Sequence, residues 1–280
     1  VKPKIIASTA TISRAKEQCS ELYNREVFQF PPQGIDQEDS FFAKEDADKY
    51  GRTYIGVMPS GKTKAMTESM MLATLLQRGQ EYEADDSVKD SYWTVTGYFN
   101  SLRELGKCSS IVQSDVRDNI RRLAYRNMFR YGRRNILKAD ELTSHVTTTE
   151  LNRTLDKLEK VRYSSDKDNR TNPSNILLAT NMISVGIDID RLNVMLVMGQ
   201  PKLTSEYIQA SSRVGRKYPG VVFTQYDSAR SRDRSHYEQF KPYHESFYKY
   251  VEPTGATPFS KPARERALHA IVIALLRHLN

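Results

Sequence analysis

Cysteine is scarce in this sequence, and long apolar runs are absent. Cys19 and Cys108 are the only cysteines in 280 residues, too few for a disulfide framework or a four-ligand zinc site. The five histidines are scattered along the chain, so we predict no metal site. The longest apolar run, residues 270–276, is far shorter than the roughly 20 residues of a membrane span. The composition argues against a disulfide miniprotein, a zinc ribbon and a membrane protein.

Basic residues outnumber acidic ones, and much of the excess lies in one segment. The chain has 42 Lys and Arg against 34 Asp and Glu, a formal net charge of +8. We predict a helix over residues 115–138, with Arg122, Arg126, Arg130 and Arg133 spaced to form one stripe. Such a stripe can contact nucleic-acid phosphates. The alternative is a solvated helix face anchored by the aromatic residues between the arginines.

Alternating apolar segments indicate the fold class. Strands are expected at residues 176–180, at 194–198 and near 221–223, with a helix over 205–214 between the last two. This alternation predicts an α/β fold with a mainly parallel sheet flanked by helices. Further expectations are strands at 4–12, 53–58 and 91–99, and a helix that begins with the capping-box pattern Thr147-x-x-Glu150.

The segment QASSRVGR, residues 209–216, carries the strongest chemical signal. Gln209, Arg213 and Arg216 have the spacing i, i+4, i+7, which predicts one shared face of a helix. Two guanidinium groups beside an amide can hold a polyanion through forked hydrogen bonds. The alternative is an ordinary basic, solvated helix face.

A second pattern precedes it in the segment ILLATNMISVGIDID, residues 176–190. An apolar strand ends at Thr180 and Asn181, Gly186 permits a tight backbone path, and Asp188 follows with an acceptor. Parallel sheets bind ligands outside the carboxyl ends of their strands. The alternative is a strand end followed by an ordinary turn.

These two patterns, in this order, resemble motifs V and VI of superfamily 2 helicases. Ser8–Thr11 resembles motif III of that family with an additional threonine, and Phe99–Ser101 resembles motif IV. Thr147–Thr149 falls where a nucleic-acid-contacting motif lies between motifs IV and V. Residues 231–260 are similar to the region after motif VI in the helicase-like component of bacterial DISARM anti-phage systems and related large helicases.

The resemblance implies a RecA-like fold and an ATP site shared between two such domains. Arg213 and Arg216 would contact the β- and γ-phosphates as arginine fingers, and Gln209 would order the phosphate or the attacking water. Gly186 and Asp188 would lie near the ribose. The P-loop and the Mg²⁺ ligands are expected in an N-terminal RecA-like domain outside this sequence, so this chain alone should hydrolyse little ATP.

The resemblance also implies a nucleic-acid track, with DNA favoured over RNA. We expect the track to include Thr180, Asn181, Asn100, Ser101 and Thr148, together with Arg122, Arg126 and Arg130 of the basic segment. Residues 1–50 would end the first RecA-like domain, 51–225 would form the second, and 226–280 would be a truncated C-terminal extension. Expected partners are nucleic acid, the N-terminal domain and members of a defence or repair complex, in the cytoplasm and without a membrane.

One motif competes with this interpretation. Gly56–Thr63 matches the P-loop pattern G-x-x-x-x-G-K-[ST] in full, between an expected strand and an expected helix. It lies after the motif III-like segment, Pro59 lacks an amide donor, and Asp140-Glu141 follows no clean apolar strand. We therefore favour an ordinary turn. An independent P-loop NTPase and a non-catalytic nucleic-acid-binding module remain the alternatives.

Overall fold

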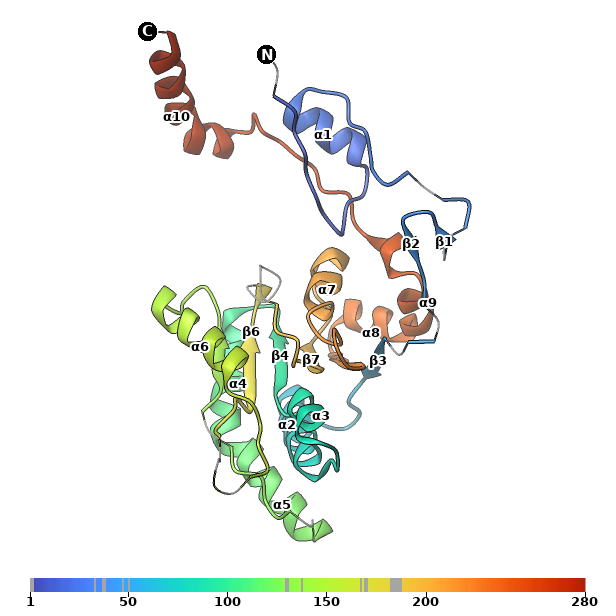
Figure 1. Cartoon of the computed structure of the whole chain (residues 1–280), viewed down its shortest axis with the longest axis vertical. Helices are drawn as coiled ribbons and strands as arrows, with labels where there is room; N and C mark the ends of the chain where they lie inside the picture. Colours follow the sequence, from blue (N-terminus) through green and yellow to red (C-terminus); the bar gives the residue numbers. More distant parts are fainter. Residues whose placement is uncertain are drawn as a thin grey trace. The chain divides into compact units, whose positions relative to one another are not determined.

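The chain divides into two compact units, Val1–Ala47 with Val251–Asn280, and Asp48–Tyr250 (Figure 1). The computed structural model describes residues 3–32, 34–36, 39–46, 48–49, 51–128, 131–136, 138–166, 168, 171–181 and 188–279. The predictions for Gly186 and Arg130 lie outside these residues.

The smaller unit contains little regular structure. Its elements are α1 (Ala15–Tyr23), an antiparallel pair of short strands β1 (Asp39–Ser40) and β2 (Ala43–Lys44), and α10 (Lys261–Leu279). Neither helix has a buried residue. The strand predicted at 4–12 is wrong: a strand needs a hydrogen-bonding neighbour, and none of the described residues pairs with this segment. Among the described helices, none combines the length and apolarity needed to cross a bilayer.

The larger unit is built on a six-stranded sheet in the order β3-β8-β7-β4-β6-β5. Every neighbouring pair in it is parallel, which confirms the predicted RecA-like α/β class. The strands are β3 (Arg52–Val57), β4 (Val95–Phe99), β5 (Asp140–Leu142), β6 (Ile176–Ala179), β7 (Val194–Met198) and β8 (Gly220–Gln225). Strand β4 begins later than predicted because helix α3 (Asp86–Ser91) runs to the first predicted residue and a turn follows over residues 92–94.

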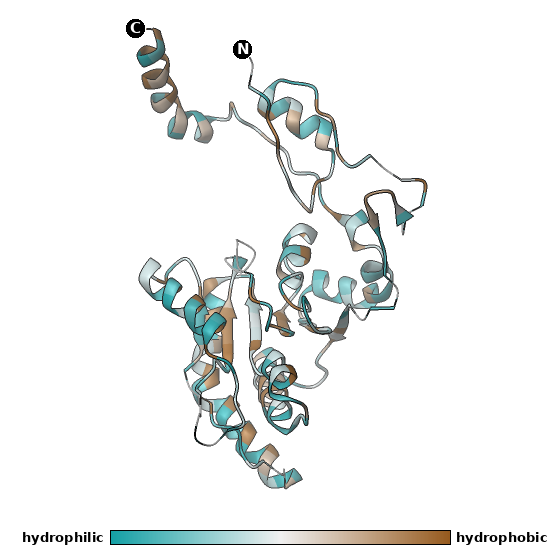
Figure 2. Ribbon diagram, in the orientation of Figure 1, coloured by the Kyte–Doolittle hydropathy of each residue, from teal (hydrophilic) through white to brown (hydrophobic). Residues whose placement is uncertain are grey.

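Helices cover both faces of this sheet, so its central strands are buried on both sides, and the ribbon of β6 is brown (Figure 2). Strands β4, β6 and β7 are buried at every position. One face packs against α2 (Lys64–Glu81), α4 (Leu102–Ile111), the π-helical turn η1 (Val112–Val116) and α5 (Arg117–Asn127). The other packs against α6 (Thr148–Lys160), α7 (Thr204–Ser211) and α9 (Phe240–Glu245).

The capping box predicted from Thr147-x-x-Glu150 is confirmed at the start of α6. The Thr147 hydroxyl accepts a hydrogen bond from the Glu150 amide at 3.3 Å. The Glu150 carboxylate in turn accepts one from the Thr147 amide at 3.2 Å. These two bonds satisfy amides that the helix itself leaves without a partner. The Thr147 hydroxyl also donates to the Glu150 carboxylate at 2.8 Å, and this bond, followed by the one from the Thr147 amide, lowers the pKa of Glu150.

The helix predicted over residues 115–138 is wrong at its far end. Helix α5 ends at Asn127, and Met128 turns into the left-handed region with φ 43°. The chain then returns to the sheet through Arg134, whose side chain is buried. Arg134 therefore has a structural position and cannot belong to a solvated basic stripe.

Residues 226–250 continue the larger unit through α8 (Ser231–Glu238), α9 and the 3₁₀ turn η3 (Phe247–Tyr250). A hydrogen-bonded chain joins them to the sheet. The His244 Nδ1–H donates to the Phe240 carbonyl at 2.7 Å, so the neutral ring accepts at Nε2 from the Tyr207 hydroxyl, 2.9 Å away. The Tyr207 oxygen lies 3.1 Å from the Thr224 hydroxyl of β8. Burial of the ring favours the uncharged imidazole.

Acidification should therefore weaken the larger unit. Burial lowers the pKa of His244, so the unfolded chain binds the proton more readily than the folded one. The free energy of unfolding is expected to fall as the pH drops below about 6.5, the ordinary value for histidine. Urea titrations at pH 7.5 and pH 5.5 should show that the advantage of the wild type over His244→Gln shrinks at the lower pH. An advantage that is equal at both values would contradict this assignment.

Candidate functional site

The parallel sheet separates the predicted site residues into two groups. All carboxyl ends of its strands lie along one edge and all amino ends along the other. The predicted nucleic-acid residues that follow β4, β5 and β6 lie at the carboxyl edge: Asn100, Ser101, Thr148, Thr180 and Asn181. The predicted phosphate-binding residues precede β7 and β8 and lie at the amino edge: Asp188, Arg213 and Arg216.

The predicted helix face shared by Gln209, Arg213 and Arg216 is wrong, because α7 ends at Ser211. Gln209 lies in its last turn, and the two arginines follow in a turn. Gly215 has φ +73°, a conformation that other residues rarely adopt. A Cβ atom there would lie 2.8 Å from Cγ of Arg52 and 2.9 Å from the backbone of Gly220. The helix therefore stops where the chain must pass closely between β3 and β8.

The arginine turn, residues 213–216, is held by backbone contacts from three directions. The Gly215 amide donates to the Leu192 carbonyl at 3.2 Å and to the Asn193 side-chain oxygen at 3.0 Å. The Arg52 guanidinium donates to the Val214 carbonyl at 3.2 Å. The Val214 side chain is fully buried in the core. The backbone between the two arginines is therefore rigid.

Asp188 and Arg216 form an ion pair that joins the two helicase-like motifs. The Asp188 side chain is 68% exposed and that of Arg216 is 30% exposed, so solvent screens the pair and its contribution to stability is small. Arg213 is half-buried. Because a weak surface pair exchanges readily, Arg216 is able to leave Asp188 for a more highly charged anion such as a phosphate.

The carboxyl edge contains the topological switch point of the sheet. Strand β4 leads into α4 on one face, while its neighbour β7 leads into α7 on the other. Asn100 lies at this point, and its Nδ2 donates to the carbonyls of Met198 and Gly199, both at 3.2 Å. Ser101 caps α4 by accepting from the Glu104 amide at 3.3 Å. Ligands of open α/β sheets bind in the crevice at such a point.

The remaining carboxyl-edge residues differ in accessibility. Thr180 is only 7% exposed, and its amide donates to the Leu142 carbonyl at 3.4 Å. Asn181 and Thr148 are exposed. The side chains of Asn181 and Thr148 can therefore contact a large ligand, whereas that of Thr180 has little accessible surface.

Arg122 and Arg126 are exposed on α5, away from the other candidates. The continuous helix from Leu102 to Asn127 is about 39 Å long at 1.5 Å per residue. It starts at the carboxyl edge and runs beside β4, whose five residues span about 17 Å. The helix therefore continues past the amino edge, where α5 ends (Figure 1). The structure does not bring these arginines together with Asn100 and Ser101.

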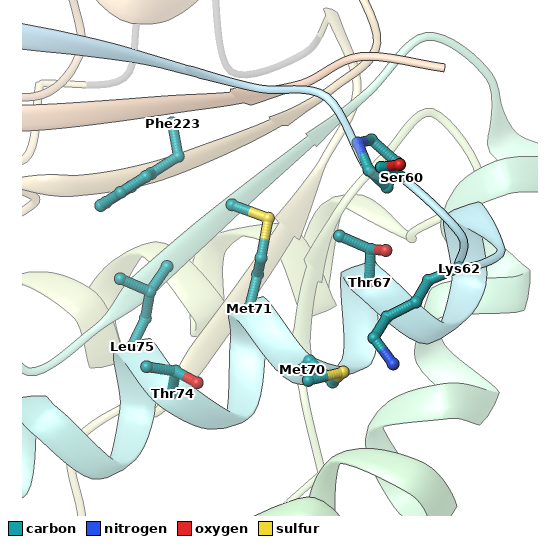
Figure 3. A pocket seen from close by; sticks show the side chains of 9 residues that line it. Ser60, Lys62, Thr67, Met70, Met71, Thr74, Leu75 and Phe223 are labelled. Carbon is teal, nitrogen blue, oxygen red and sulfur yellow. The ribbon is translucent and has the colours of Figure 1, made fainter. Parts of the chain in front are cut away.

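The P-loop-like segment Gly56–Thr63 lacks the features of a phosphate cradle. Gly56 belongs to β3, where a Cβ atom would lie 2.8 Å from the ring of Phe240, so packing explains this glycine. The Thr63 hydroxyl, the Mg²⁺ ligand in a working P-loop, instead caps α2 by accepting from the Met66 amide at 3.2 Å. The pocket beside this segment, about 420 Å³, has mostly apolar walls, among them Met70, Met71, Leu75 and Phe223 (Figure 3).

The acidic pair Asp140-Glu141 does not form a magnesium site for this segment either. It lies in β5. Strands β3 and β5 are the two outermost strands of the sheet, about 24 Å apart at 4.8 Å per strand. Asp140 accepts hydrogen bonds from Lys157 at 2.7 Å and Ser174 at 2.6 Å. Glu141 accepts one from Ser109 at 3.0 Å. Both carboxylates are structural.

This geometry predicts that Lys62 has no part in nucleotide binding. Calorimetric titration of this chain with Mg·ATP should detect no micromolar binding, either in the wild type or in Lys62→Ala. Micromolar binding by the wild type that disappears in Lys62→Ala would instead establish an independent P-loop site.

The comparisons with known proteins define the class. Residues 105–218 match the family described as helicase conserved C-terminal domain. That match lies within the parallel sheet of the larger unit, which has a RecA-like fold and is similar there to helicase C-terminal domains. The chain is similar to the DISARM protein DrmA of Bacillus paralicheniformis (strain ATCC 9945a / NCIMB 11709 / CD-2). The two sequences are 45% identical over 284 residues. The alignment covers 99% of this chain and 25% of that relative, so the chain spans about a quarter of its length.

Solved structures share the fold at low sequence identity. The DUF1998 helicase MrfA bound to DNA and AMPPNP matches 91% of this chain over 29% of its own, with a TM-score of 0.57 and 14% identity. The helicase Lhr of Mycobacterium smegmatis, bound to ssDNA and AMP-PNP, matches 81% of this chain over 25% of its own. Its TM-score is 0.52 and its identity 13%. These matches support the RecA-like fold.

Several residues that hold the site together gave no sequence signal. Asn193 and Arg52 contact the arginine turn, yet neither belongs to a recognisable motif. Arg191 is buried and pairs with Asp90 at 2.5 Å. Each of these contacts joins two segments that are far apart in the sequence, and only the packing of the sheet makes them neighbours.

Proposed function

We propose that this chain supplies the second of two RecA-like domains in an ATP-dependent nucleic-acid helicase or translocase. The observation that carries the proposal is the arginine turn. It presents Arg213 and Arg216 from a rigid backbone at the amino edge, with Asp188 beside them. The relationship to DrmA supports a role in DISARM-type defence, which would operate in the cytoplasm.

In this proposal Arg213 and Arg216 bind the phosphates of ATP held by the other RecA-like domain. Guanidinium groups match phosphate oxygens in charge and in geometry, but they cannot ligate Mg²⁺. Among the described residues, no three His, Cys, Asp or Glu side chains gather closely enough to hold a metal ion. Bound Mg·ATP would supply the phosphoryl group for transfer to water. Gln209 would orient the phosphate or that water, and Asp188 and Gly186 would contact the ribose.

The carboxyl edge would hold the nucleic-acid strand. Asn100 at the switch point and the exposed Ser101, Thr148 and Asn181 offer amide and hydroxyl groups of the kind that contact phosphates and sugars. The solved structures of MrfA and Lhr contain DNA, which supports DNA as the partner. Arg122, Arg126 and Arg130 would contact a more distant part of the strand. Residues 1–50, 51–225 and 226–280 would be the end of the first domain, the second domain and an extension.

The decisive test is ATP hydrolysis by the full-length protein carrying Arg213→Ala. The proposal requires a severe loss of hydrolysis with nucleic-acid binding retained. A non-catalytic module that uses the same arginines to hold a nucleic-acid strand predicts instead that nucleic-acid binding is weakened and that ATP hydrolysis is unchanged.

A further inference from the structure

Asn193 is fully buried immediately before β7, and both ends of its side chain are used. Its Nδ2 donates to the Ser91 carbonyl at 3.1 Å. Its Oδ1 accepts from the Gly215 amide at 3.0 Å, and its backbone carbonyl accepts from the Val221 amide at 2.8 Å. One residue thus joins the end of α3, the arginine turn and the start of β8.

A buried amide is costly unless every polar atom has a partner, whereas a fully satisfied one makes its surroundings rigid. An apolar side chain would fill the same space without directing a hydrogen bond at Gly215. The Leu192 carbonyl alone, at 3.2 Å, would then hold the Gly215 amide. Gly215 has no Cβ atom, so its backbone has more conformational freedom than that of other residues and depends on hydrogen bonds for its orientation.

We infer that Asn193 is a positioning residue that orients Arg213 and Arg216 toward the phosphates of ATP by fixing the Gly215 amide between them. The inference rests on the proposed function. Val214 and Gly215 connect the two arginines, so a small rotation of the Gly215 peptide groups changes the position of one guanidinium group relative to the other. Misplacing a catalytic group by about 1 Å can cost about 10² in rate.

Asn175 provides a matched control at the same edge of the sheet. It is also a buried asparagine that immediately precedes a strand, β6, and its Oδ1 accepts from the Arg134 guanidinium at 3.1 Å and 3.0 Å. Among the described residues, its hydrogen bonds go to Arg134 and Val95, outside the arginine turn. Its replacement removes a comparable buried hydrogen bond without touching Gly215.

The experiment measures steady-state ATP hydrolysis and the thermal midpoint of the full-length protein. Asn193→Ala should lower kcat about 10²-fold, while Asn175→Ala should lower the thermal midpoint and leave kcat within about twofold. In an Arg213→Ala background, Asn193→Ala should cause little additional loss, because residues that act as a unit are not additive. Should Asn193→Ala fail to fold, Asn193→Leu serves as the second variant. Its side chain fills the same space but accepts no hydrogen bond from the Gly215 amide, so its kcat should fall by a similar factor.

A wild-type kcat for Asn193→Ala, or for Asn193→Leu if that variant is used, would overturn the inference. So would an equal loss in the wild-type and Arg213→Ala backgrounds. If Arg213→Ala itself hydrolyses ATP normally, the proposed function fails and the inference fails with it. If Arg213→Ala is inactive and Asn193→Ala is not, only the positioning role fails.

Discussion

Replacing Arg213 by alanine in the full-length protein is expected to reduce ATP hydrolysis by about 10³-fold or more, the range for loss of an arginine finger. That factor corresponds to about 4 kcal/mol of transition-state stabilisation. The turn is held at Val214 and Gly215, so its backbone cannot readily shift to bring another group to the position of the missing guanidinium. Steady-state hydrolysis with saturating nucleic acid gives the measurement.

The control for this prediction is Arg78→Ala. Arg78 is an exposed arginine on α2, outside the arginine turn, so the same loss of charge there should leave hydrolysis within about twofold. The thermal midpoint of Arg213→Ala should stay close to that of the wild type, because Arg213 follows α7 and is only half-buried. Retention of more than a tenth of the activity, with weakened DNA binding, would favour the non-catalytic module.

Replacing Arg134 by alanine is expected to have the largest effect on stability, about 3–5 kcal/mol in the free energy of unfolding. The guanidinium donates to the carbonyls of Leu76 and Trp93, both at 2.7 Å, and to Asn175. It also stacks 3.8 Å from the centre of the Trp93 ring. Burial lowers the pKa of Arg134 to about 9, a measure of how strongly the site is desolvated. Alanine would leave these acceptors unsatisfied around a cavity.

Trp93 makes this prediction easy to measure, because it is the single tryptophan of the chain and touches Arg134 directly. Urea unfolding followed by its fluorescence should give a lower midpoint for Arg134→Ala and a changed emission before unfolding. The neighbouring Arg133 is exposed, and Arg133→Ala should change the free energy of unfolding by less than about 0.5 kcal/mol. Equal effects of the two substitutions would refute a structural role for Arg134.

Much of the fold was predictable because its central strands, β4, β6 and β7, have no solvent-facing side. Strand β7 coincides with its predicted range and β6 ends one residue earlier, since continuous apolar runs are readable without tertiary information. The capping box at Thr147 was predictable for a similar reason, because both of its partners are local in sequence. Strand β5 was not predictable, because its three residues, Asp140–Leu142, form a strand only by pairing with β6.

The sequence by itself determined the parallel α/β fold, the helicase-like motifs and their order, because these depend on local apolar patterns and on residue types at fixed spacings. Only the tertiary structure decided that Arg213 and Arg216 lie beyond the end of α7 and that Arg134 is buried rather than solvated. It also decided that Asn193 and Arg52 hold the arginine turn. These outcomes depend on close contacts between distant segments, Gly215 against Gly220 above all, and no local pattern records which segments will meet.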